Sequence, residues 1–98
     1  MKNVIYLNDL YDIYGELLDD NKKEYFKLYY FDNLSLSEIS EKKMVSRNAV
    51  YKQLKSIEEK LNFFESKLNL YKKRKEFKDI LDKIDDKELV EKLNNISW

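Results

Sequence analysis

Apolar residues recur at helical spacing through the first third of the chain. The first set predicts a helix over residues 4–18, and the second predicts a helix over about 20–31. Asp19 is a preferred residue type for the N-cap of the second helix. The Asp32-Asn33 pair predicts a turn after it, because both side chains can bond nearby backbone groups. The two apolar sets are Leu7, Leu10, Tyr11, Tyr14, Leu17 and Leu18, then Tyr25, Phe26, Leu28, Tyr29 and Phe31.

The central segment contains two helix-start signals separated by a short turn. Ser35 and Glu38 have the spacing of a capping box and predict a helix over about 36–42. Ser46 is a second N-cap, so a longer helix is expected to begin at Arg47. The turn between them has no glycine, so Lys43 or Met44 must take its strained position. Two capped helices with inward-facing apolar residues are typical of a helix-turn-helix. Those inward residues are Leu36, Ile39, Val50 and Leu54.

From Val50 the apolar positions alternate at spacings of four and three, which makes a heptad seam of about three repeats. The seam comprises Val50, Leu54, Ile57, Leu61, Phe64, Leu68 and Tyr71. Because Val50 and Leu54 must fill the helix-turn-helix core, the later positions are available for another contact. We predict that Leu61, Phe64, Leu68 and Tyr71 form a homodimer interface; the alternative is packing against the last two helices of the same chain.

The last third of the chain predicts two more helices. Residues 72–75 are all basic and indicate a helix end or a joint. The apolar residues Phe77, Ile80, Leu81 and Ile84 predict one helix, and Asp85 with Glu88 predicts the capped start of the other. The domain organisation expected is a helix-turn-helix domain over residues 1–69 and a C-terminal helical extension over residues 70–98, which we expect to take part in dimerisation.

Composition narrows the fold to the all-α class. The 98 residues include one glycine and no proline, so almost nothing interrupts a helix. Hydrophobic residues make up 43% of the chain, which is enough for a core. We therefore expect an all-α protein with a helix-turn-helix core, a long recognition helix and a C-terminal helical extension.

Several classes of function are disfavoured by missing residue types. Histidine and cysteine are absent, and no glycine-rich phosphate loop is present, so we expect neither an enzyme nor a metal or cofactor site. Helix capping explains the paired carboxylates at 19–20 and 85–86. No apolar run approaches the roughly 20 residues that span a bilayer, so we expect a cytoplasmic protein without membrane contact.

Net charge is zero, which argues against a general polyanion binder, but the charge is unevenly distributed. Residues 1–34 carry 4 basic and 7 acidic side chains, whereas residues 35–60 carry 6 basic and 4 acidic ones. The basic segment is the one that contains the predicted recognition helix. This distribution permits nucleic-acid binding without demanding it. Double-stranded DNA is the partner that we expect from the helix-turn-helix pattern.

The candidate nucleic-acid contacts lie at the start of the helix that begins at Arg47. A recognition helix presents its N-terminal residues to base edges, where Arg suits guanine and Asn suits adenine. Flanking hydroxyl and ammonium groups suit phosphates. The competing interpretation is an ordinary solvated helix face. The predicted set is Lys43, Ser46, Arg47, Asn48, Tyr51, Lys52 and Lys55, with Lys42 as an alternative to Lys43.

Residues 18–61 resemble region 4 of bacterial sigma factors, which binds the promoter −35 element. The resemblance is carried by the helix at 24–30, the run NLSLSEISE at 33–41, Val45-Ser46 at the turn, and the residues Val50, Leu54 and Lys60-Leu61. Residues 6–69 are more similar to the YlxM family of small proteins that are like sigma region 4. The segments concerned are LYDIYGELL, KKEYFKLYYFDNLSLSEIS and VSRNAVYKQLKSIEEKL. For the all-α fold, the resemblance implies a helix-turn-helix core of the sigma region-4-like, winged-helix-superfamily type.

The resemblance implies a DNA-binding regulatory protein connected with the signal recognition particle pathway, because the family's genes lie beside that of the signal recognition particle GTPase. The alternative is an adaptor that binds no DNA and contacts that GTPase or its RNA. The chain has no segment resembling sigma region 2, so the resemblance does not extend to promoter melting.

Overall fold

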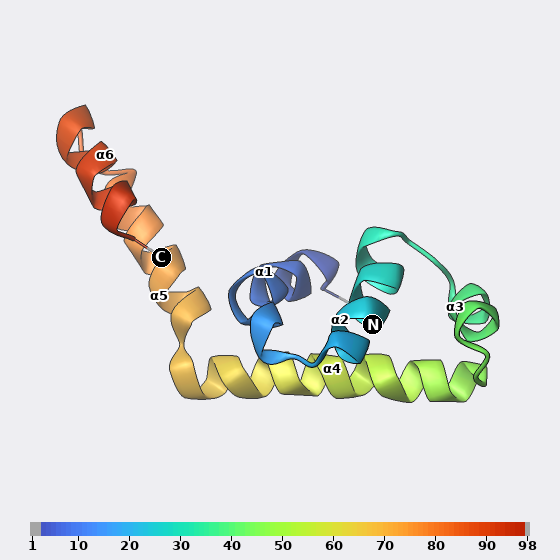
Figure 1. Ribbon diagram of the computed structural model, residues 1–98. Helices are drawn as coiled ribbons and strands as arrows, with labels where there is room; N and C mark the ends of the chain where they lie inside the picture. Colours follow the sequence, from blue (N-terminus) through green and yellow to red (C-terminus); the bar gives the residue numbers. More distant parts are fainter. Residues whose placement is uncertain (1–2, 98) are drawn as a thin grey trace. The chain divides into compact units, whose positions relative to one another are not determined.

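The computed structural model describes residues 3–97, and every regular element in that range is helical (Figure 1). The expected all-α class is therefore confirmed. The elements are α1 (Val4–Tyr14), a 3-10 turn η1 (Gly15–Leu17), α2 (Asp20–Phe26), a π-helical segment η2 (Lys27–Phe31), α3 (Leu36–Lys43), α4 (Arg47–Leu68), α5 (Leu70–Leu81) and α6 (Lys87–Ile96). The chain divides into two compact units between Leu68 and Asn69.

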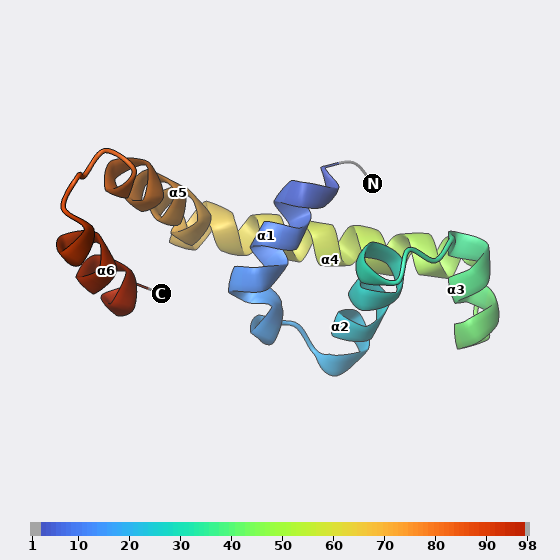
Figure 2. The same cartoon turned by 90° about the horizontal axis from the view of Figure 1, so that it is seen from above.

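The first unit is organised around α4, against which α1, α2 and α3 all pack. Figure 1 shows these helices along one side of α4, and Figure 2 shows α1 crossing over it. The inner face of α4 carries four side chains that are at most 1% exposed, namely Val50, Leu54, Ile57 and Leu61. The other fully covered side chains of this unit come from the three smaller helices: Leu10, Tyr14, Phe26 and Ile39. The core is thus a layer of short helices on one long helix.

Aromatic side chains fill the space between α1 and α2. The ring of Phe26 stacks on Tyr11 at a centroid distance of 4.2 Å and on Tyr30 at 4.4 Å. Burial raises the pKa of the Tyr30 hydroxyl to about 12. The predicted helix over residues 4–18 ends earlier than expected, at Tyr14. A Cβ atom at Gly15 would lie 3.1 Å from the Tyr11 ring, so a glycine allows this close approach where the helix tightens into η1.

The helix-start prediction is confirmed at Asp19 and shifted by one residue at the last helix. The Lys22 backbone N–H donates to the Asp19 carboxylate at 2.8 Å. At the start of α6 it is Asp86, not Asp85, whose carboxylate accepts from the Leu89 backbone N–H, at 3.1 Å. Both carboxylates therefore lie at helix N-termini, where they satisfy backbone donors.

The heptad seam does not continue through one helix. Helix α4 ends at Leu68, and Asn69 adopts the left-handed conformation with φ 55° before α5 begins. The predicted joint at residues 72–75 is therefore wrong, because those residues lie inside α5. Asn is one of the few residues that enter the left-handed region at modest cost, which explains why the break falls there.

The four residues predicted to form the dimer interface lie in different environments. Leu61 is 0% exposed in the core of the first unit, so its assignment to a dimer interface is corrected. Phe64 is half-buried, and its ring lies 5.9 Å from that of Tyr14 on α1. Leu68 is 47% exposed at the end of α4, whereas Tyr71 is half-buried in the second unit. Leu61 is unavailable to a second copy because the helices that pack on α4, among them α1, cover its inner face.

Leu54→Ala should lower the free energy of unfolding by about 2–5 kcal/mol, because it removes a fully buried side chain and leaves a cavity. Leu17→Ala is the matched control, since Leu17 is 60% exposed and should cost well under half as much. Chemical denaturation of both variants measures the difference. Equal losses in the two variants would show that the inner face of α4 has been misidentified.

Candidate nucleic-acid interface

The turn between α3 and α4 is closed by a left-handed residue. Met44 has φ 57° and ψ 44°, so of the two residues expected in this conformation it is Met44 that adopts it. The Val45 N–H donates to the Ser40 carbonyl at 3.1 Å, and the Met44 N–H donates to Glu41 at 3.3 Å. This pair of bonds is a Schellman motif, which ends α3 and turns the chain towards α4.

The start of α3 is fixed by the predicted capping box. The Glu38 backbone N–H donates to the Ser35 hydroxyl at 3.1 Å, and the Ser35 N–H donates to the Glu38 carboxylate at 2.9 Å. The same hydrogen bond from the Ser35 backbone lowers the pKa of Glu38. Two backbone donors at this helix end are satisfied by side chains, so the first residue of α3 is set locally.

Ser46 is the N-cap of α4, and its hydroxyl can still donate a hydrogen bond. Its hydroxyl oxygen accepts from the Ala49 backbone N–H at 3.0 Å, and its carbonyl accepts from the Val50 N–H at 3.1 Å. A serine hydroxyl has one O–H donor in addition to its acceptor sites. The side chain is exposed, so that donor is directed at no buried group.

The inner faces of α3 and α4 meet through three fully buried residues. Ile39, Val50 and Leu54 are each 0% exposed, as the sequence predicted for the helix-turn-helix core. Leu36 differs, because it is only half-buried at the first turn of α3. The core contacts therefore begin one turn into α3.

The outer face at the start of α4 brings the predicted base-reading residues together. Arg47, Tyr51 and Lys55 are spaced by four residues, and Asn48 and Lys52 form the neighbouring row with the same spacing. All five are exposed, as is the small side chain of Ala49 on the first turn. The sequence argument did not include Ala49, because an alanine in a helix carries no signal of its own.

The basic surface ends where acidic residues begin. Glu58 and Glu59 follow Lys55 within one turn of α4. On the side of α4 that faces α2, the Gln53 amide oxygen accepts a hydrogen bond from the Lys22 ammonium at 2.9 Å. The acidic pair thereby separates the basic and polar group on the first three turns of α4 from the exposed Lys60 further along the helix.

Lys43 lies in a different environment from the other six predicted contacts. Its ammonium pairs with the Glu24 carboxylate of α2 at 2.5 Å and lies 5.2 Å from the centroid of the Tyr25 ring. The ion pair lowers the pKa of Glu24 below its ordinary value. The Lys43 side chain is 17% exposed, whereas the neighbouring Lys42 is an exposed residue. Lys43 therefore ties the end of α3 to α2.

Other kinds of site were sought in the described range. Residues 3–97 contain no group of three or more carboxylate, imidazole or thiol side chains arranged to hold a metal ion. None of the helices in the same range is both long enough and apolar enough to cross a membrane.

Comparison with known proteins agrees with this geometry. Residues 1–97 match the family described as "Putative helix-turn-helix protein, YlxM / p13 like". A UPF0122 protein of Thermoanaerobacter sp. (strain X514) is 48% identical over 80 residues, which cover 82% of this chain and 68% of the relative. A UPF0122 protein of Ureaplasma urealyticum serovar 10 is 45% identical over 91 residues, covering 93% of this chain and 92% of the relative. The chain therefore belongs to the UPF0122 family of YlxM/p13-like helix-turn-helix proteins.

Proposed function

We propose that this protein is a regulatory protein that binds double-stranded DNA with the first turns of α4 in the major groove. The observation that carries the proposal is that the first turns of α4 are buried on one side and exposed on the other. Val50 and Leu54 are fully buried against α3, while the opposite side presents an exposed group of basic and polar residues. That is the division of roles in a recognition helix.

The contacts divide between bases and phosphates. Arg47 and Asn48 lie on the first turn, so they read base edges, with Arg suited to guanine and Asn to adenine. Tyr51, which is 43% exposed, lies one turn further along the same side. Lys52 and Lys55 contact phosphates, and the Ser46 hydroxyl donates a hydrogen bond to another phosphate.

The length of the basic face fits one groove. Eight residue steps separate Arg47 from Lys55, which is about 12 Å along a helix and is close to the width of the major groove. Beyond it, Glu58 and Glu59 would be repelled by phosphates. One copy of the protein therefore reads a short stretch of base pairs.

A single copy has few cationic contacts. Each neutralised phosphate adds about −0.9 to the slope of log K against log salt concentration, and only three or four cations are present to make such contacts. Binding of one copy at physiological salt is therefore expected to be weak. Helix-turn-helix proteins solve this by binding as dimers to two half-sites about 34–36 Å apart. We therefore propose that the protein acts as a homodimer.

A second candidate function is an adaptor that contacts the signal recognition particle GTPase or its RNA without binding DNA. The observation in its favour is the zero net charge, together with the acidic balance of residues 1–34. These features weaken long-range attraction to DNA. The same surface of α4 would then meet a protein or RNA partner.

Selection from random duplex DNA, with the bound fraction measured at low and at physiological salt, separates the two candidates. Enrichment of a palindromic motif supports the DNA-binding regulator. If no motif is enriched and the protein instead retains purified GTPase or its RNA in a pull-down, the adaptor replaces it.

Arg47→Ala should weaken binding to the selected duplex by about 1–3 kcal/mol and relax preference at one base position, because a base-edge contact is lost. Lys55→Ala should weaken binding to all duplexes alike and reduce the slope of log K against log salt by about one. Fluorescence anisotropy titrations at several salt concentrations measure both quantities.

The exposed Lys60 lies five residues beyond Lys55 on α4, past the acidic pair, and Lys60→Ala serves as the control. It should leave both specificity and salt slope unchanged. Identical behaviour of the Arg47 and Lys55 variants would contradict the proposed division between base and phosphate contacts.

Lys43→Met should leave the salt slope of DNA binding unchanged, because its ammonium is engaged by Glu24. The variant should lose stability at neutral pH instead. Since the pair lowers the pKa of Glu24, its stabilisation is present above the ordinary glutamate pKa and is lost as pH falls through the lowered one. The difference in melting temperature between wild type and variant should therefore shrink on acidification to about pH 3.

The opposite pattern would revive the original assignment of Lys43 to a phosphate. In that case Lys43→Met reduces the salt slope by about one, and its effect on melting temperature is independent of pH.

A further inference from the structure

The α5–α6 hairpin has almost no core of its own. Leu81 is the one described side chain of either helix that is buried, and it is still 6% exposed. The unit begins at Asn69 and spans about 30 residues, a length at which a chain rarely buries enough apolar surface to be stable without help. Its amphipathic helices therefore need a further surface to cover them.

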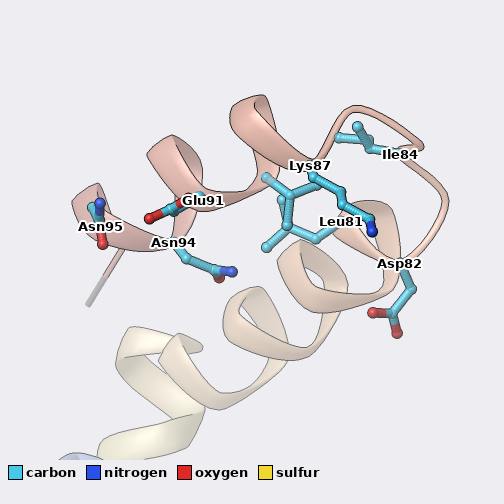
Figure 3. Close-up of a pocket in the computed structure, with 8 residues that line it drawn as sticks. Leu81, Asp82, Ile84, Lys87, Glu91, Asn94 and Asn95 are labelled. Carbon is cyan, nitrogen blue, oxygen red and sulfur yellow. The ribbon is translucent and has the colours of Figure 1, made fainter.

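An apolar surface lies along this hairpin. Ile80 is 61% exposed, Leu89 is 44% exposed and Ile96 is 81% exposed. Between the helices is an open pocket of about 420 Å³, whose lining is mostly polar and includes none of these three residues (Figure 3). The exposed apolar residues are thus separate from the pocket. Two amphipathic helices with an uncovered apolar side are the parts from which four-helix bundles are built.

Charge is separated along the length of the hairpin. Lys73 and Lys75 are exposed near the start of α5. The opposite end, where α5 passes into α6, carries the exposed carboxylates Asp82, Asp85, Asp86 and Glu88 together with the exposed Lys83 and Lys87, so residues 82–88 have a balance of −2. One end of the hairpin is therefore basic and the other is acidic.

We propose that the surface formed by Ile80, Leu89 and Ile96 binds the same surface of a second copy of this chain, making an antiparallel four-helix bundle from two α5–α6 hairpins. Antiparallel pairing sets the basic end of each hairpin against the acidic end of the other. Parallel pairing would bring the aspartates of both copies together, and like charges would oppose it. Charge complementarity thus selects both the occupant and its direction.

This inference rests on the proposed function, because the bundle would hold together the homodimer that we propose for DNA binding. The bundle itself involves only α5 and α6. These helices contain 12 and 10 residues, so they are about 18 and 15 Å long. Helices this short offer a small contact, so we expect a weak, reversible dimer that a titration of protein concentration can resolve.

Sedimentation equilibrium of the full chain between about 1 and 200 µM, without DNA, tests the proposal. The wild type should pass from monomer to dimer across this range. Ile80→Asp and Leu89→Asp should each raise the dissociation constant by tenfold or more, because a charge enters the apolar contact. A wild type that stays monomeric at 200 µM would overturn the proposal while leaving the DNA selection to be judged separately.

The control is Ile5→Asp, which places the same charge on an 81% exposed isoleucine of α1 and should leave the dissociation constant unchanged. Circular dichroism of each variant establishes that its helix content is retained. If Ile5→Asp disrupts the dimer as strongly as Ile80→Asp does, the interface lies elsewhere and the proposal fails.

The direction of pairing is tested by reversing charge at one end. Lys73→Glu combined with Lys75→Glu should weaken the antiparallel dimer several-fold, because the attraction to the aspartates is lost, and the difference should diminish at high salt. In a parallel bundle the same double substitution would relieve repulsion and strengthen the dimer. Strengthening would therefore overturn the antiparallel arrangement.

Discussion

The inner face of α4 is the contact on which the first unit depends. Val50, Leu54, Ile57 and Leu61 are all covered, and the three preceding helices pack on the helix that carries them. Because the same helix supplies the candidate DNA contacts on its opposite side, burial of this face also fixes which residues face outwards. Stability and recognition are therefore coupled through the rotation of one helix about its axis.

One local motif and one tertiary contact hold the end of α3 in place. The Schellman motif at Met44 ends α3 without a glycine, and the Lys43–Glu24 ion pair ties the same end of α3 to α2. A left-handed methionine is strained relative to glycine. The strain is offset by the backbone hydrogen bonds from the Met44 and Val45 N–H groups, which satisfy carbonyls at the end of α3.

The C-terminal unit differs from the first unit in how little apolar surface it buries. Its helices carry strong apolar faces but bury one described side chain, so their stability has to come from contacts beyond the hairpin itself. Small helical units commonly meet this requirement by association. A basic end and an acidic end on one hairpin give such an association a direction.

Sequence alone determined the helical class, the capping box at Ser35, the N-cap at Ser46 and the start of α4, because these depend on side chains and backbone groups within four residues of one another. Tertiary structure decided the rest. The heptad seam is continuous in sequence, yet α1 buries Leu61 and a left-handed Asn69 interrupts the seam before Tyr71. Lys43 is likewise a surface cation by sequence, and its partner Glu24 lies on another helix. Periodicity defines a face of a helix, but only packing between distant segments decides what covers that face.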